Sequence, residues 1–470
     1  MRPVQLCAAV AGLLSCAAHA RNLPSLNQQP KVVQLPTKRN TVTSPLSRDR
    51  LRRRGSLQAG LENEETLYYI NTTIGTPAQS LRLQIDTGSS DLWVNTPASN
   101  ECSASGSPCA STGTYSANDS STYEYVGSWF NISYVDGSSA GGDYVKDTVT
   151  VGSTTLDQLQ FGIGYTSSTS QGILGIGYPS NEVQVGRAGK SAYNNLPAAL
   201  VSAGSISRNA YSLWLNDLDS SNGSILFGGI DAARYTGSLS TLPIQKYDDA
   251  YSEFLLTLTD VSFGNKSIAS DEALAVLLDS GSSLTYLPDS WTQTIFNQVD
   301  AQYDSSSGVA YVVCSLRDSE QALKFTFSSP SITVSMDELV IDVTANGEPL
   351  KFSDGQDACL FGIAPAGSST SVLGDTFLRS AYVVYDIENN QISLAQTNFN
   401  ATKTSIQEIP TGTSMPGATF VSNSVEATGG VSSSSSITTG SGDYQNAAPA
   451  ASVPGPYMIV AVAIFGSVML

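Results

Sequence analysis

Short apolar and alternating runs of strand length recur along the middle of the chain, and clusters of Gly, Ser, Asn and Asp separate them. Four clear examples are residues 67–74, 81–85, 92–95 and 382–385. Helical spacing is rare: residues 196–203 and 290–299 have it, and Pro288 and Asp289 precede the second segment as start signals. The pattern predicts an all-β protein, mainly strands with a few short helices.

The two ends of the chain have a different character. Residues 1–20 contain Arg2, an apolar stretch and the small-residue pattern Ala18-His19-Ala20, which is typical of a cleaved secretory signal. From Asn400 the sequence becomes rich in Ser, Thr, Gly and Pro. We interpret residues 399–446 as a Ser/Thr-rich stalk outside the core. The remaining length suits one large β-rich enzyme or a two-lobed one.

Charge changes sign along the chain at Arg54. Nine Lys or Arg and one acidic residue lie between residues 21 and 54, whereas 13 basic and 40 acidic residues follow, a formal charge of −27. Such an acidic body repels nucleic acid and anionic membrane surfaces and favours cationic partners. Solubility in an acidic medium explains the charge equally well.

Histidine is almost absent, and this excludes several chemistries. The one histidine, His19, lies in the signal and leaves with it. Ser-His-Asp and Cys-His nucleophile systems need an imidazole base, and common zinc sites need imidazole or a cysteine cluster. If the mature protein is a hydrolase that uses acid–base chemistry, carboxylates must supply it, and we expect neither metal nor cofactor.

Four cysteines remain after the signal, namely Cys102, Cys109, Cys314 and Cys359. In a secreted chain this number suggests two disulfides, and three pairings are open. We prefer Cys102–Cys109 with Cys314–Cys359, because these two loops do not cross.

One hexapeptide occurs twice with conservative exchanges, 193 positions apart. The sequences are Ile85-Asp86-Thr87-Gly88-Ser89-Ser90 and Leu278-Asp279-Ser280-Gly281-Ser282-Ser283, each an apolar strand followed by a tight turn. A single copy would most simply be an Asp that caps a turn. Two copies in matched contexts favour two halves of one site.

The chemistry of paired carboxylates explains these residue types. Two carboxylates within hydrogen-bonding distance share one proton, so one can act as base and the other as acid on a water. Gly88 and Gly281 allow the sharp turns, and the hydroxyls of Thr87 and Ser280 can tie the two loops together. Ser89 and Ser282 can then bind the outer carboxylate oxygens.

Five segments together resemble the pepsin-like aspartic proteases, in family order, over residues 68–397. IDTGSSDLWV (85–94) and LLDSGSSLTYLP (277–288) resemble the active-site segments, and ISYVDGSSAGG (132–142) resembles the flap hairpin that closes over substrate. GILGIGY (172–178) and SVLGDTFLRSAYVVYD (371–386) resemble the segments that support the two loops. LFGGIDAARYTGSL (226–239) is similar to the segment near the lobe junction.

The resemblance implies a bilobal β fold with the substrate cleft between the lobes and with Asp86 and Asp279 as catalytic residues. It places Tyr134 at the flap-tyrosine position, with Trp93 as hydrogen-bond donor to its hydroxyl, although either ring alone would be taken for a packing aromatic. It also implies an inhibitory prosegment, which the basic stretch ending at Arg54 suits better than an incidental tail. The resulting division is signal 1–20, propeptide 21–54, N-terminal lobe 55–235, C-terminal lobe 236–398, stalk 399–446 and a removed tail 447–470.

Asp136 and Gly137 occupy the flap tip, two and three residues beyond Tyr134. An ionised Asp136 there would attract Lys or Arg before the scissile bond; Asp136-Gly137 is equally a strong hairpin-turn signal. With the tail described below, Asp136 favours the yapsin-like group of fungal surface proteases, which cleave at basic residues. Residues 103–128 are short and nearly uncharged where that group often has a long acidic insertion.

The C-terminus predicts a lipid anchor. Residues 457–470 are uncharged and largely apolar but too short for a comfortable membrane span. Asn446-Ala447-Ala448 followed by eight residues before this tail fits a glycosylphosphatidylinositol (GPI) signal, with Asn446 as attachment residue and Gly442 as the alternative. N-glycosylation sequons begin at Asn71, Asn118, Asn131, Asn222, Asn265 and Asn400, and any one can stay unused.

We therefore predict a monomeric, cell-surface aspartic endopeptidase that acts on proteins and peptides. The alternative is a catalytically silent wall or adhesion glycoprotein on the same fold.

Overall fold

The computed structural model describes residues 30–42, 62–63, 65–134, 138–220, 222–345 and 348–430. All of them belong to one compact unit, Met1–Ser435. The predicted signal, the processing site at Arg54, the flap-tip residues Asp136 and Gly137, and the predicted attachment residue Asn446 lie outside the described residues.

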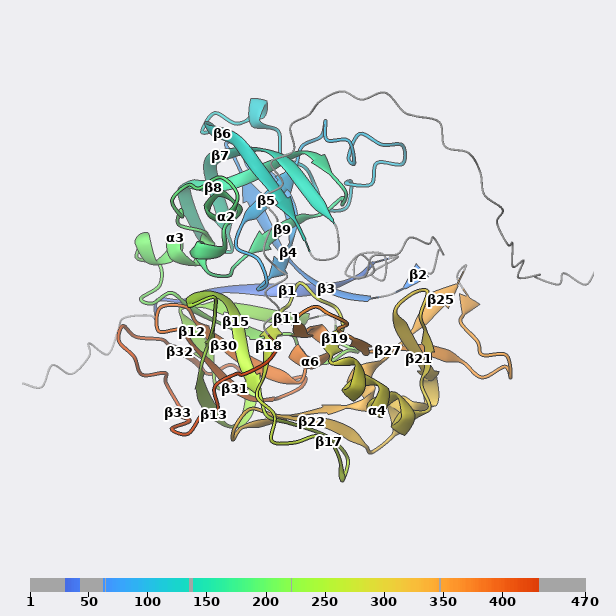
Figure 1. Cartoon of the computed structure of the whole chain (residues 1–470). Helices are drawn as coiled ribbons and strands as arrows, with labels where there is room; N and C mark the ends of the chain where they lie inside the picture. Colours follow the sequence, from blue (N-terminus) through green and yellow to red (C-terminus); the bar gives the residue numbers. More distant parts are fainter. Residues whose placement is uncertain are drawn as a thin grey trace, which may run out of the picture. The chain divides into compact units, whose positions relative to one another are not determined.

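The largest sheet in the described part of the chain joins fourteen strands. In spatial order they are β33 (Ala418–Phe420), β13 (Tyr235–Pro243), β31 (Gln391–Thr397), β30 (Ala381–Asp386), β10 (Ala210–Trp214), β11 (Asn222–Phe227), β1 (Val33–Val42), β3 (Glu65–Ile74), β4 (Gln79–Asp86), β9 (Gly172–Gly175), β5 (Leu92–Asn95), β8 (Thr154–Ser167), β7 (Ser139–Val151) and β6 (Glu124–Ser133). Strands β4 to β9 form one lobe, and this sheet continues from it into the other (Figure 1).

The second lobe contains smaller sheets. A six-stranded sheet has the order β14 (Gln245–Tyr247), β15 (Ala250–Leu258), β18 (Leu274–Leu278), β29 (Ser371–Leu373), β19 (Thr285–Leu287) and β28 (Ile363–Pro365). Two four-stranded sheets are β17 (Lys266–Ala269), β16 (Asp260–Phe263), β22 (Ala322–Thr326), β23 (Ser331–Ser335), and β20 (Gln302–Asp304), β21 (Val309–Val313), β27 (Ala358–Phe361), β24 (Val340–Ile341). The remaining strands are β2 (Glu62–Asn63), β25 (Val343–Ala345), β26 (Glu348–Pro349), and the pair β12 (Gly229–Asp231) and β32 (Ile406–Glu408).

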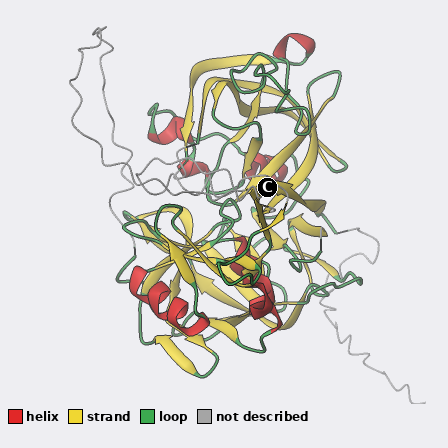
Figure 2. Cartoon of the chain, turned by 90° about the vertical axis from the view of Figure 1, so that its right-hand side faces the viewer, coloured by secondary structure: helices red, strands yellow, loops and turns green. Residues whose placement is uncertain are grey.

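The described helices are short and few beside the strands (Figure 2). They are α2 (Val183–Gly186), α3 (Leu196–Ser202), α4 (Asp289–Val299), α5 (Met336–Leu339) and α6 (Asp375–Leu378), with short 3-10 turns at Ala117–Asp119, Pro179–Asn181 and Cys314–Asp318. The predicted helices are α3 and α4, and the four predicted strands are β3, β4, β5 and β30. No helix in the described ranges has the length and hydropathy needed to cross a membrane.

Alternation along the strands builds the core. In β4, Leu81, Leu83 and Ile85 are buried and Arg82 is half-buried, although Gln84 near the site is buried as well. α4 begins after Pro288, as the sequence predicts, and ends at Asp300, which adopts a left-handed conformation with φ 51°. Both preferred disulfides are present, Cys102–Cys109 and Cys314–Cys359.

The predicted propeptide contributes a central strand. β1 lies between β11 and β3 and pairs with both in antiparallel register, for example Leu35 with Ile225 and Arg39 with Tyr68. A cut at the predicted boundary before residue 55 would therefore separate β1 from the two strands with which it pairs.

The predicted stalk is wrong for residues 399–430, which pack on the protease body. β32 pairs with β12, and β33 pairs in parallel with β13. Ile409 and Met415 are buried beside Trp214 and Tyr382. We call residues 399–430 the strap. Its Ser, Thr, Gly and Pro composition suggested a linker, but backbone pairing of β32 and β33 joins it to the protease body.

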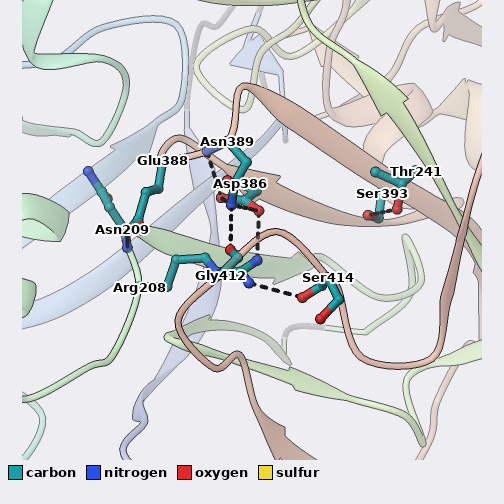
Figure 3. Close-up of polar contacts among 9 residues, drawn as sticks. All are labelled: Arg208, Asn209, Thr241, Asp386, Glu388, Asn389, Ser393, Gly412 and Ser414. Carbon is teal, nitrogen blue, oxygen red and sulfur yellow. Dashed lines mark hydrogen bonds and ion pairs between the residues drawn. The ribbon is translucent and has the colours of Figure 1, made fainter.

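The strap also covers a buried ion pair (Figure 3). Arg208 and Asp386 are 0% and 1% exposed, and Arg208 Nη1 lies 2.8 Å from Asp386 Oδ2. Arg208 Nη2 donates to the carbonyl of Ser414 at 2.9 Å, and Asn389 Nδ2 donates to the carbonyl of Gly412 at 3.0 Å. The strap thus supplies acceptors for the buried Arg208 and the half-buried Asn389 of the protease body.

Candidate active site

Asp86 ends β4, and its carboxylate is held by its own loop. β4 pairs in parallel with β9 and ends at Asp86, and the chain leaves the sheet there. Asp86 is 3% exposed. The Gly88 amide donates to Oδ1 at 2.9 Å, and the Ser89 hydroxyl donates to Oδ2 at 2.5 Å. Two donors on one carboxylate fix its plane.

Asp279 follows β18 and repeats this arrangement. It is 6% exposed. The Gly281 amide donates to Oδ1 at 2.8 Å and the Ser282 hydroxyl to Oδ2 at 2.7 Å. The two hexapeptides therefore give the same local hydrogen bonds, as their sequence similarity predicts.

Two hydroxyls cross between the loops. The Thr87 hydroxyl donates to the carbonyl of Leu278 at 3.0 Å and accepts from the Ser280 amide at 2.9 Å. The Ser280 hydroxyl donates to the carbonyl of Ile85 at 3.2 Å and accepts from the Thr87 amide at 3.2 Å. Because both side chains are buried, these four bonds lock the loops in a two-fold symmetric pair.

The glycines show how closely the loops approach. A Cβ on Gly281 would lie 2.4 Å from Asp86 Oδ1, and one on Gly88 would lie 2.7 Å from Asp279 Oδ1. Each carboxylate thus lies against the opposite loop, in the space that a side chain would need. The structure brings Asp86 and Asp279 into one site.

The segments at 172–178 and 371–386 support the loops through backbone bonds. The Ile176 amide donates to the carbonyl of Asp86 at 3.0 Å, and the Asp279 amide donates to the carbonyl of Leu373 at 3.1 Å. Backbone groups make these bonds, and apolar side chains fill the space behind them.

The flap begins as predicted. β6 and β7 form the hairpin, and the Tyr134 amide donates to the carbonyl of Ser138 at 2.8 Å. Trp93 Nε1 donates to the Tyr134 hydroxyl at 2.7 Å, which joins the flap to the strand that follows the Asp86 loop.

Sequence reasoning missed a buried carboxylate behind the flap. Asp91 is fully buried; its Oδ1 accepts from Tyr144 at 2.6 Å and Tyr193 at 2.9 Å, and its Oδ2 accepts from the Val183 amide at 2.8 Å. Burial raises the pKa of Asp91, and these hydrogen bonds oppose that rise. Asp91 thus connects the end of the Asp86 loop to β7 of the flap. Its position directly after Ser90 was the available signal.

This arrangement can activate a water. Two carboxylates, each fixed by an amide and a hydroxyl, present neighbouring oxygens to one molecule. One carboxylate can take a proton from water while the other gives a proton to a substrate carbonyl oxygen.

Comparison with known proteins gives the class. Residues 67–397 match the eukaryotic aspartyl protease family, and the chain belongs to that family.

Individual relatives agree with this assignment. The chain is 55% identical over 428 residues to the probable aspartic-type endopeptidase opsB of Aspergillus oryzae, covering 89% of this chain and 86% of the relative. It is 37% identical over 358 residues to candidapepsin-3 of Candida albicans, covering 74% and 83%. The crystal structure of an aspartic proteinase from Irpex lacteus aligns with a TM-score of 0.60 and 22% identity, covering 80% of this chain and all of the other, and shares the fold. The protein is an aspartic-type endopeptidase.

Proposed function

We propose that Asp86 and Asp279 are the catalytic residues of this endopeptidase and that they hydrolyse peptide bonds through a water held between them. The symmetric set of bonds from Gly88, Ser89, Gly281 and Ser282 carries this proposal, because it orients both carboxylates alike. The Thr87 and Ser280 hydroxyls keep the halves in register. Tyr134 on the flap, fixed by Trp93, covers the substrate.

The test is cleavage of an unfolded protein at pH 4 by the parent enzyme and by Asp86→Asn. Substitution by Asn keeps the shape and removes the titrating group, so we expect cleavage to fall to background while the unfolding temperature stays near that of the parent. Equal cleavage by both proteins would refute the catalytic role. Absence of cleavage by the parent itself would instead favour the silent surface glycoprotein.

We propose a preference for Lys or Arg near the cut, as in yapsin-like proteases. Asp136 at the flap tip motivates it, and the acidic body, with its formal charge of −27 after Arg54, supports attraction of cationic substrates. Cleavage mapping in a peptide library tests it. Absence of Lys and Arg enrichment on the amino side of the cut would remove the role of Asp136 and leave Asp136-Gly137 as a hairpin turn.

For location, we propose a secreted enzyme with a removable basic prosegment that is anchored to the outer cell surface through GPI at Asn446. The signal-like N-terminus and the small-residue site before an apolar tail motivate this. All six sequon asparagines are exposed, which supports glycosylation on the secretory route. Release of activity from intact cells by a phosphatidylinositol-specific phospholipase is the expected result; activity that stays cell-bound would count against a lipid anchor.

A further inference from the structure

A second carboxylate lies beside Asp279 and has no role in the catalytic pair. Glu253 is on β15, which pairs in antiparallel register with β18, with Leu255 opposite Leu277. Continuing this register by two residues brings Glu253 opposite Asp279. Residues opposite each other on paired strands share a face, so the continued register would put Glu253 on the same face as Asp279.

The neighbours of Glu253 confirm which way it faces. Phe254, the next residue, is buried on the opposite face against Tyr385, with ring centroids 4.6 Å apart. Glu253 itself is half-buried. Burial and then the charge of Asp279 raise the pKa of Glu253, which agrees with a carboxyl group facing the catalytic side.

Glu253 has no hydrogen-bond or ion-pair partner among the described residues. A partly desolvated carboxylate without a donor is costly, and a cation that arrives with the substrate would remove that cost. Glu182 is another acid with an oxygen, Oε1, that has no partner among the described residues. It is 1% exposed, so a substrate cannot reach it. By contrast, the charge of Asp279, one of the two proposed catalytic residues, acts on Glu253.

We infer that Glu253 is a specificity-determining residue whose carboxylate binds the ammonium or guanidinium group of a substrate Lys or Arg close to the scissile bond. This inference rests on the proposed preference for basic residues and assigns it to a residue of the second lobe in addition to Asp136 on the flap. Since only the ionised carboxylate attracts a cation, the preference strengthens as pH rises and Glu253 loses its proton.

The experiment compares kcat/KM for peptide pairs that differ at one position, Lys against acetyl-lysine, at each of three positions on either side of the cut. Parent, Glu253→Gln and Asp136→Asn are measured, with Glu272→Gln as the matched control, because Glu272 is an exposed acid in the loop before β18. We expect Glu253→Gln to lower the Lys preference about tenfold at one position and to change the acetyl-lysine peptides less than threefold. Glu272→Gln should match the parent.

The pH dependence and a charge reversal sharpen the result. The Lys preference of the parent at that position should rise as pH increases above the ordinary Glu value of 4.5, and Glu253→Gln should abolish the rise. Glu253→Lys should turn the preference there toward Asp or Glu, a gain that a misfolded variant could not show.

Each alternative outcome overturns a different statement. If Glu253→Gln keeps the Lys preference of the parent and Asp136→Asn loses it, the Glu253 inference is wrong and the proposed basic preference stands. If the parent cleaves acetyl-lysine and Lys peptides alike at every position, both statements are wrong and the endopeptidase assignment remains.

Discussion

The smallest unit of the proposed catalytic site is a glycine facing a carboxylate. Gly281 leaves room for Asp86 Oδ1, which would lie 2.4 Å from a Cβ at that position. We predict that Gly281→Ala lowers kcat at least 100-fold, because the methyl group displaces the Asp86 carboxylate from its position against the loop. The unfolding temperature should change by only a few degrees. Peptide hydrolysis and thermal unfolding measure the two effects.

The matched control is Gly429→Ala, since a Cβ at Gly429 meets nothing within 4 Å. Its kcat should equal that of the parent. A Gly281→Ala enzyme with near-parental kcat would show that the carboxylates do not need this close approach.

At the scale of single residues, the sequence predicted those site residues whose hydrogen-bond partners are close in the sequence or whose motif occurs twice. Asp86 and Asp279, with their Gly and Ser donors, form bonds within five residues, and the repeat identified both copies. Asp91 could not be assigned because its partners Tyr144 and Tyr193 are 53 and 102 positions away. Glu253 could not be assigned either, because its position follows from the register of β15 on β18.

At the scale of elements, apolar alternation predicted the strands of both lobes, since burial on one face leaves a two-residue period. It could not predict the strap. Residues 399–430 have little apolar periodicity and bury few side chains, among them Ile409 and Met415. Their backbone groups pair with β12 and β13, and composition carries no information on such pairing.

The strap should therefore stabilise the enzyme. We predict that a chain ending at Gly430 has the unfolding temperature of the full chain, whereas a chain ending at Asn398 is strongly destabilised or fails to fold. The shorter chain loses β32 and β33, and it leaves Arg208, which is fully buried, without its Ser414 acceptor. Thermal unfolding of the two truncations makes the comparison.

A point variant avoids the risk that the short chain never folds. Ile409 is fully buried, so Ile409→Ala should cost about 2–5 kcal/mol in free energy of unfolding, measured in urea. Val425→Ala is the control within the strap, because Val425 is exposed and should cost less than about 0.5 kcal/mol. Equal effects of the two variants would mean that the strap packs loosely and that the stalk interpretation was correct after all.

At the scale of the whole molecule, the excess of acidic residues makes the folded protein more stable at acidic than at neutral pH. The chain after Arg54 has 13 basic and 40 acidic residues, so its carboxylates repel one another at neutral pH. Glu182 acts in the same direction. It is 1% exposed, its Oε2 accepts from the Tyr193 amide at 2.8 Å, and its Oε1 has no partner within the described ranges. Burial raises its pKa to about 9.

The sign follows from the two states of Glu182. The folded protein keeps the proton up to about pH 9, whereas the unfolded chain loses it above the ordinary Glu value of 4.5, so unfolding releases a proton between these values. The free energy of unfolding therefore falls as pH rises through this window, by up to about 1.4 kcal/mol per pH unit. Asp147 has the opposite effect on the free energy of unfolding, because its pKa is lowered in the folded protein. Its stabilising contribution is lost only when the pH falls below the ordinary Asp value of 3.8.

We predict an unfolding temperature that is highest near pH 5 and falls toward pH 8. Thermal unfolding in an Asp86→Asn background, which prevents self-digestion, measures it. Glu182→Gln should flatten the fall without removing it, and about 0.5 M NaCl should raise the unfolding temperature more at pH 8 than at pH 5, because salt screens the surface carboxylates but not a buried one. A parent protein most stable at neutral pH would contradict both contributions, whereas a salt effect equal at the two pH values would contradict only the surface charge.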